Sequence, residues 1–154
     1  MKFLILSILC PFAIASDLKL NAHPGYDLSL HYQRAPFLPS DIADVCEKNG
    51  GKPGVIQSEH INGLIVADTP ELEGLVGAQI PFFQIGLYAQ DQQLKWFDDR
   101  VSSNYTNFPQ GFEIPSGRVY FALDPHGTDG RQPGEWFALP AEQGSTGAIC
   151  GHIY

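Results

Sequence analysis

The stretch from Phe83 to Phe108 constrains the fold more than any other part of the chain. Apolar side chains occupy every second position over 83–88, which predicts a strand with one buried face. Gly86 interrupts this strand, and a glycine there indicates a bulge or the close approach of another backbone. A polar turn over 89–93 leads to a second short strand over 94–97. The pattern predicts a hairpin followed by a long irregular excursion.

The rest of the chain predicts helices early and short strands late. Ser40 and Ser58 are good N-caps for a short helix through Ile42, Val45 and Cys46 and for a second helix over 59–67. Residues 70–77 fit either a helical turn or a loop. Further strands are expected over 26–32, 55–56, 118–123, 136–139 and 148–150. This order predicts an α+β fold.

The N-terminus is typical of an exported protein. Met1-Lys2 precedes an apolar run, and Ala13-Ile14-Ala15 is a small-x-small cleavage pattern. The run is too short to span a bilayer, so we expect a signal peptide over 1–15 and no membrane insertion. Residues 16–25 are polar without periodicity and predict a loose arm, which leaves one domain over 26–154. The protein is therefore expected to be secreted.

The charge argues against nucleic-acid binding, and the cysteine content indicates a disulfide. The net charge is −8, and no basic stripe is present that could neutralise nucleic-acid phosphates. Cleavage of the signal peptide would remove Cys10 and leave Cys46 and Cys150. An even count in an oxidising compartment favours one disulfide over the alternative of two buried free thiols.

A set of spaced motifs gives the central stretch a family resemblance. The motif residues are Ile85-Gly86-Leu87, Trp96 with Asp98, Tyr105 with Asn107, and Gly111 with Pro115, flanked by Ala43, Cys46, Gly50-Gly51, Gly134, Trp136 and Cys150. In order and spacing they resemble the C-type lectin-like domain, over about 26–154. The resemblance implies two short helices, antiparallel strands and a long irregular loop region. It also implies that Cys46 is bridged to Cys150.

In that family the late loops, here 109–117 and 124–134, hold a calcium ion that binds sugar hydroxyls. The family motifs are Glu-Pro-Asn in the loop and Trp-Asn-Asp on a late strand, whereas this chain has Glu113-Ile114-Pro115-Ser116 and Trp136-Phe137-Ala138. Calcium needs six to eight oxygen ligands, and two of the expected ones are replaced by apolar side chains. We therefore expect no metal or cofactor at this site. A different calcium site built from Asp124, Asp129 and Glu135 stays open.

The resemblance predicts a ligand at the late loops, with the ligand-binding residues Phe112, Glu113, Ile114 and Ser116. The ligand is expected to be a glycan or an extracellular protein. An alternative is a protein-interaction module without sugar binding that uses Phe108, Phe112 and Ile114, because clustered apolar side chains suit a protein contact. A small secreted hydrolase is less favoured, since only scattered carboxylates such as Asp98-Asp99 support it. We expect no enzymatic activity.

Three further residues have alternative interpretations. Asn104-Tyr105-Thr106 is an N-glycosylation sequon in a polar link, so Asn104 is a predicted glycan acceptor, although such triplets also occur by chance. Trp96 and Trp136 lie within strand patterns, which favours core anchors over sugar-stacking platforms. The sequence does not indicate an oligomeric state.

Overall fold

A computed structural model of the chain describes residues 15–154. The expected signal peptide, apart from Ala15, lies outside the described residues. The elements in chain order are β1 (Ala15–His23), β2 (Tyr26–Phe37), a 3-10 turn (Pro39–Asp41), α1 (Ile42–Glu47), β3 (Lys52–Pro53), α2 (Glu59–Val76), β4 (Phe83–Gln90), β5 (Gln93–Trp96), β6 (Val119–Leu123), β7 (Trp136–Leu139) and β8 (Ser145–Ile153).

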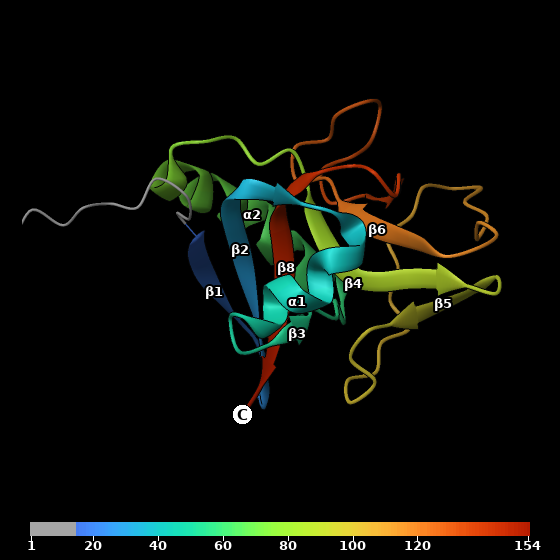
Figure 1. Cartoon of the computed structure of the whole chain (residues 1–154), viewed down its shortest axis with the longest axis horizontal. Helices are drawn as coiled ribbons and strands as arrows, with labels where there is room; N and C mark the ends of the chain where they lie inside the picture. The colour runs from blue at the N-terminus through green and yellow to red at the C-terminus, as the bar shows by residue number, and fades with distance from the viewer. Residues whose placement is uncertain (1–14) are drawn as a thin grey trace, which may run out of the picture.

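The strands form one twisted sheet in the order β1-β2-β8-β4-β6-β7, with β3 paired to β8 and β5 paired to β4. Every described pairing is antiparallel except that of β4 with β8, which is parallel. Helix α1 lies in front of this sheet and α2 behind it (Figure 1). The predicted α+β fold is confirmed. None of the described helices is long and apolar enough to cross a membrane.

The hydrophobic core has two parts because the sheet is covered on both faces. The larger cluster includes Ile61, Ile65 and Leu72 of α2, together with Leu28 and Leu30 of β2. Each such side chain contributes about 1.5–3 kcal/mol when it leaves water. The smaller cluster gathers under α1 and consists of Phe37, Ile42, Val45, Cys46, Ala148 and Cys150.

The disulfide lies inside the smaller cluster. Cys46 of α1 is bonded to Cys150 of β8, with an S–S distance of 2.06 Å, and both residues are fully buried. The bridge that the family resemblance implies is confirmed, and the alternative of two free thiols is wrong. It ties the first helix to the last strand, so the two ends of the domain are joined covalently.

The prediction of a loose N-terminal arm over 16–25 is wrong. This segment belongs to β1, which pairs along β2 with Leu18 opposite Leu30 and Leu20 opposite Leu28. Leu20 is buried in the main cluster. The sequence pattern did not indicate this strand because its second face carries charged side chains. On that face the Lys19 ammonium lies 2.7 Å from the Asp27 carboxylate. Polar and charged residues are common on an edge strand that has one face exposed to solvent.

The second helix is much longer than the predicted 59–67, so it is not a short helix. The predicted cap is confirmed, because the Ser58 hydroxyl accepts a hydrogen bond from the Ile61 N–H at 3.2 Å. The helix continues through Pro70 to Val76 and ends at Gly77, whose φ is +66°. Proline removes one backbone donor from a helix, but the fully buried Leu72 repeats the apolar face beyond it.

Two other local predictions need correction. Ser40 does not cap α1; it lies inside the 3-10 turn, and α1 begins at Ile42 after Asp41. Val55 and Ile56 are fully buried but form no strand. The short strand is instead β3, three residues earlier, where Lys52 pairs with Gly151. Burial was predicted correctly, whereas the backbone pairing depends on which segment meets β8.

Gly86 meets both expectations for a glycine inside a strand. Its N–H donates to the Gly54 carbonyl at 2.9 Å, and a Cβ there would lie 2.6 Å from that same oxygen. The pairing of β4 with β6 also shifts register between Gln84 and Tyr88, as a bulge does. The hairpin turn is tighter than predicted and consists of Asp91 and Gln92, both with positive φ, as in a type I′ turn.

Candidate ligand-binding loops

A segment without helix or strand connects β5 to β6, over residues 97–118. A second irregular segment, 124–135, connects β6 to β7. Both lie toward the side of the domain that carries β5 and β6 (Figure 1). The predicted long irregular region is confirmed. Below, "late loops" means residues 109–117 and 124–134.

Two stacked phenylalanine rings fix the start of the first late loop to the domain. The Phe108 and Phe112 rings are 3.7 Å apart and nearly parallel. Phe108 also packs edge to face against Phe121 and Trp136, with ring centroids 5.1 and 5.5 Å apart. Both rings therefore pack onto the core, and Phe112 is only partly exposed. Of the three apolar residues that could serve a protein contact, Ile114 remains as the exposed one, with 37% of its surface accessible.

The other predicted ligand-binding residues lie on the surface of the same loop. Glu113, Ile114 and Ser116 are exposed between Gly111 and Gly117. These two glycines have φ values of +85° and +80°, which residues other than glycine rarely adopt. The loop is therefore anchored by rings on its inner side and presents polar groups outward. Ligand binding by these residues stays a prediction.

A buried carboxylate organises the second late loop. Asp124 has no exposed surface. Its oxygens accept hydrogen bonds from the His126, Gly127 and Thr128 N–H groups, the Thr128 hydroxyl and Arg131 Nε, at 2.7–3.0 Å. Burial alone would raise the pKa of Asp124, but the hydrogen bonds from Thr128, His126 and Arg131 outweigh it and hold that pKa below its usual range.

Arg131 joins this loop to the late strand β7. Its guanidinium pairs with the Asp124 carboxylate at 3.0 Å and lies 3.9 Å from the centroid of the Phe137 ring. Phe137 also packs edge to face against Phe82. A cation–π contact therefore stands at the position where the resembled family places a calcium ligand.

The residues present do not fit a calcium ion. Both oxygens of Asp124 are taken by N–H and O–H donors and by Arg131, and Phe137 and Ala138 offer no side-chain oxygen. Within the described chain, no three His, Cys, Asp or Glu side chains come together as a metal site would need. Glu113 alone supplies too few ligands. The alternative site from Asp124, Asp129 and Glu135 is unsupported, because Asp129 pairs with Arg131 at 3.6 Å.

Two asparagine side chains hold the ends of the late loops together, and the sequence predicted this role for neither of them. The Gly134 carbonyl accepts hydrogen bonds from Asn62 Nδ2 at 3.0 Å and Asn107 Nδ2 at 2.8 Å. The side-chain oxygen of Asn62, Oδ1, in turn accepts a hydrogen bond from the indole N–H of Trp136 at 2.8 Å. An asparagine in a helix is normally expected on the surface. Only the position of Asn62 on the buried face of α2 could have indicated this role.

The second late loop is also tied to α2 through a contact between His126 and Glu73. His126 Nε2 lies 2.9 Å from a Glu73 carboxylate oxygen. The same oxygen accepts the Ile80 N–H at 2.7 Å. Glu73 therefore links the end of α2, the segment before β4 and the loop at His126. These partners are far apart in sequence, which is why no motif pointed to them.

The two tryptophans are structural. Trp136 is fully buried, as predicted for a core anchor. Trp96 is half-buried, packs edge to face against Trp136 with ring centroids 5.9 Å apart, and donates its indole N–H to the Ser103 carbonyl at 3.2 Å. Tyr105 packs on Trp136 in the same way at 5.5 Å. These rings support the base of the late loops from inside.

The carboxylates at Asp98 and Asp99 do not form an acid–base pair. Asp98 is buried and accepts hydrogen bonds from Arg100 Nε at 2.9 Å and Nη2 at 3.0 Å. The side-chain hydrogen bond from Arg100 lowers the pKa of Asp98 and outweighs the effect of burial. A glycosidase general acid needs the opposite shift, and Asp99 is exposed beside it.

An aromatic surface borders the end of the first late loop and was also missed. The exposed Arg118 guanidinium lies 4.4 Å from the centroid of the Tyr88 ring, and it donates to Gln90 Oε1 at 3.0 Å and to the Tyr120 hydroxyl at 3.1 Å. Tyr88 and Tyr120 are opposite each other on β4 and β6. The contacts fix the direction in which the loop enters β6.

No protein-family model and no curated protein matches the sequence. Solved structures do match the fold. The C-type lectin domain of murine dendritic cell inhibitory receptor 2 matches with a TM-score of 0.62 and 17% identity, over 86% of this chain and 94% of that one. Human lithostathine matches at 0.63 and 16%, over 87% and 88%, and the cow CD23 carbohydrate-recognition domain at 0.61 and 15%, over 90% and 98%. Identities this low establish the fold alone, and the chain has the C-type lectin-like fold that its central motifs predict.

Proposed function

We propose that this chain is a secreted binding domain that recognises a glycan through its late loops without calcium. The observation that carries the proposal is the build of the first late loop. Its inner side is fixed by the stacked Phe108 and Phe112 rings, while Glu113 and Ser116 stand exposed on the outside. A rigid loop with outward polar groups suits hydrogen bonding to sugar hydroxyls, because little ordering entropy is lost on binding.

The structural neighbours favour a glycan over other ligands. The murine receptor domain was solved in complex with an N-glycan, and the cow CD23 domain in the presence of a GlcNAc2Man3 oligosaccharide. The same likeness favours a binding domain over an enzyme. A protein ligand is the second candidate, supported by the exposed Ile114. It is weakened because Phe108 and Phe112 pack onto the core rather than outward.

A glycan array probed in calcium and in excess chelator tests the proposal. We expect the same sugars to bind in both conditions. The double variant Glu113→Gln with Ser116→Ala should weaken that binding about tenfold or more, as expected for lost hydrogen bonds that include a charged group. Glu71→Gln, an exposed acid on α2, is the matched control and should bind as the wild type does. Binding that vanishes in chelator, or that survives the double variant, would contradict the proposal.

The thermal stability of the domain should not depend on calcium. A ligand bound only to the folded state at a hundredfold excess over its Kd would stabilise by about 2.7 kcal/mol. For a domain of this size that corresponds to a rise of several degrees in Tm. Because Asp124 is saturated by donors and Arg131, we expect equal Tm in millimolar calcium and in chelator, measured by calorimetry. A rise of more than about 3 °C with calcium would overturn this prediction.

Asn104 should carry an N-linked glycan when the protein is secreted from a eukaryotic cell. Its side chain is exposed in the irregular segment after β5, so a transferase could reach it. Treatment with an N-glycosidase should increase gel mobility, and Asn104→Gln should remove that shift. Asn107→Gln is not a suitable control because Asn107 bonds Gly134. Thr106→Ala, which breaks the sequon while keeping the asparagine, should behave like Asn104→Gln, and a wild type without a shift rejects the prediction.

A further inference from the structure

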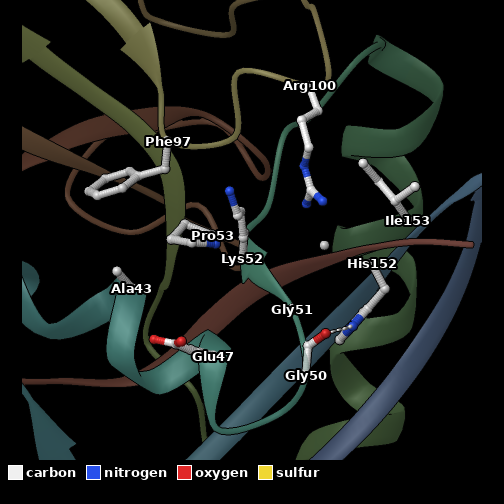
Figure 2. Close-up of a pocket in the computed structure, with 11 residues that line it drawn as sticks. Ala43, Glu47, Gly50, Gly51, Lys52, Pro53, Phe97, Arg100, His152 and Ile153 are labelled. Carbon is white, nitrogen blue, oxygen red and sulfur yellow. Dashed lines mark hydrogen bonds between the residues drawn. The ribbon is translucent and has the colours of Figure 1, made fainter.

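A second concave site lies away from the late loops, between α1, β3 and the end of β8. Its volume is about 550 Å³, and none of its lining residues belongs to 109–117 or 124–134. Figure 2 shows the side chains around it, from α1, β3, β8 and the segment after β5. Volumes of this size hold small organic ligands. The ligand-binding role proposed for the late loops therefore gives this pocket no function.

Two cations face this pocket in a chain that is strongly acidic. The pocket is lined by Lys52 and Arg100, although the chain carries a net charge of −8. Lys52 is exposed, and no carboxylate of the described residues lies within 4.0 Å of its ammonium. Figure 2 shows the ends of both side chains reaching toward the same space. The Asp98 carboxylate pairs with Arg100 and also interacts with the charge of Lys52, but it is fully buried. The exposed ends of the two cations therefore favour an anionic guest.

Arg100 is held in place before any ligand arrives. Its Nε and Nη2 atoms are bonded to the buried Asp98 carboxylate, while half of the side chain remains exposed. Asp98 itself has no exposed surface. It therefore offsets part of the Arg100 charge but cannot contact a ligand in the pocket. The Arg100 N–H groups not used by Asp98 remain available. A guanidinium fixed in this way loses little entropy when it binds an anion.

The other walls are not those of a simple anion site. Phe97, half-buried beside Pro53, provides an apolar wall. At the α1 rim, Glu47 is exposed, and Figure 2 shows its carboxylate apart from the two cations. The His152 ring lies 3.4 Å from the Gly50 carbonyl on a further side. The pocket therefore has a cationic end, an apolar wall and acceptors at the opposite rim.

We propose that this pocket binds an acidic sugar unit, with its carboxylate or sulfate on Lys52 and Arg100. The C–H face of the ring would pack on Phe97, and its hydroxyls would donate to Glu47 and the Gly50 carbonyl. An inorganic anion would leave the wall and the acceptors unused, and a neutral sugar would leave the cations unused. The site is independent of the late loops, so the chain would hold two glycan-contacting regions.

The test is an NMR titration of the full secreted domain with four probes. Methyl glucuronide and N-acetylglucosamine 6-sulfate carry the two anionic groups, methyl glucoside is neutral, and inorganic sulfate is the bare anion. We expect at least one acidic sugar to shift the amides of Gly51, Lys52 and His152 saturably, at concentrations up to about 20 mM. The probe that binds decides between carboxylate and sulfate. Added salt should weaken the binding.

Lys52→Gln should weaken binding of that acidic sugar about tenfold, since it removes a charged donor that makes no described side-chain hydrogen bond. Lys48→Gln changes an exposed lysine at the C-cap of α1 that does not line the pocket, so it is the matched control and should change nothing. Shifts by methyl glucoside or sulfate ion as large as those by the acidic sugars would overturn the proposal, as would the absence of any shift. The Glu113→Gln, Ser116→Ala variant should leave this titration unchanged, which separates it from the late-loop proposal.

Discussion

Replacing Cys46 and Cys150 together by alanine should lower the free energy of unfolding by about 2–5 kcal/mol. The bridge spans 104 residues of sequence, so its loss frees most of the domain in the unfolded state. Both residues also lie in the smaller core cluster between α1 and β8. Urea unfolding followed by circular dichroism gives the difference directly. The double variant is preferable to a single one, because it leaves no unpaired thiol.

The matched control separates the covalent link from packing. Val45→Ala removes apolar volume from the same cluster and keeps the disulfide, so it should cost less and leave the slope against urea unchanged. Reduction of the wild type should give a loss similar to that of the double variant. A double variant as stable as the wild type would contradict the assignment of a stabilising role to this bridge.

The elements that sequence predicted best are those with strong alternation. Residues 83–88 and 136–139 were predicted as strands and are β4 and β7. The prediction that only one face of 83–88 is buried is wrong, because β4 lies inside the sheet and Gln84 and Gly86 are buried as well. The misses have a physical cause as well. β1 alternates over only a few residues, with charges on its second face. The length of α2 was underestimated because Pro70 reads as a helix end, whereas burial of Leu72 stabilises the turn that follows.

The sequence predicts a position for the candidate site but not the contacts that shape its loops. The family motifs placed it in the late loops, and the missing oxygen ligands at Phe137 and Ala138 indicated that calcium does not fit. That Phe112 packs onto the core depends on its stacking with Phe108, which local sequence cannot reveal. The pocket at Lys52 and Arg100 joins positions far apart in the chain, so no spacing could have shown it.

Asp124→Asn should destabilise the domain by about 1–3 kcal/mol, the cost of leaving buried hydrogen-bond donors without an acceptor. The change keeps the shape of the side chain, but it replaces one acceptor oxygen by an NH2 group. That group would face donors, because Asp124 Oδ2 accepts from the Thr128 N–H, the Thr128 hydroxyl and Arg131 Nε. Asp129→Asn is the control, since its carboxylate is 85% exposed, and it should cost at most about 0.5 kcal/mol.

The pH dependence of stability provides an independent check on Asp124. Its folded pKa lies below the ordinary value of 3.8, so the unfolded chain takes up a proton first as the pH falls. The stabilisation is therefore present above about pH 4 and is lost as the pH drops through the folded pKa. The amide of the Asp124→Asn variant cannot titrate, so its unfolding free energy, measured between about pH 5 and 2, should fall less steeply than that of the wild type. Parallel slopes for the two proteins would mean that Arg131 and the loop N–H groups do not hold this carboxylate charged.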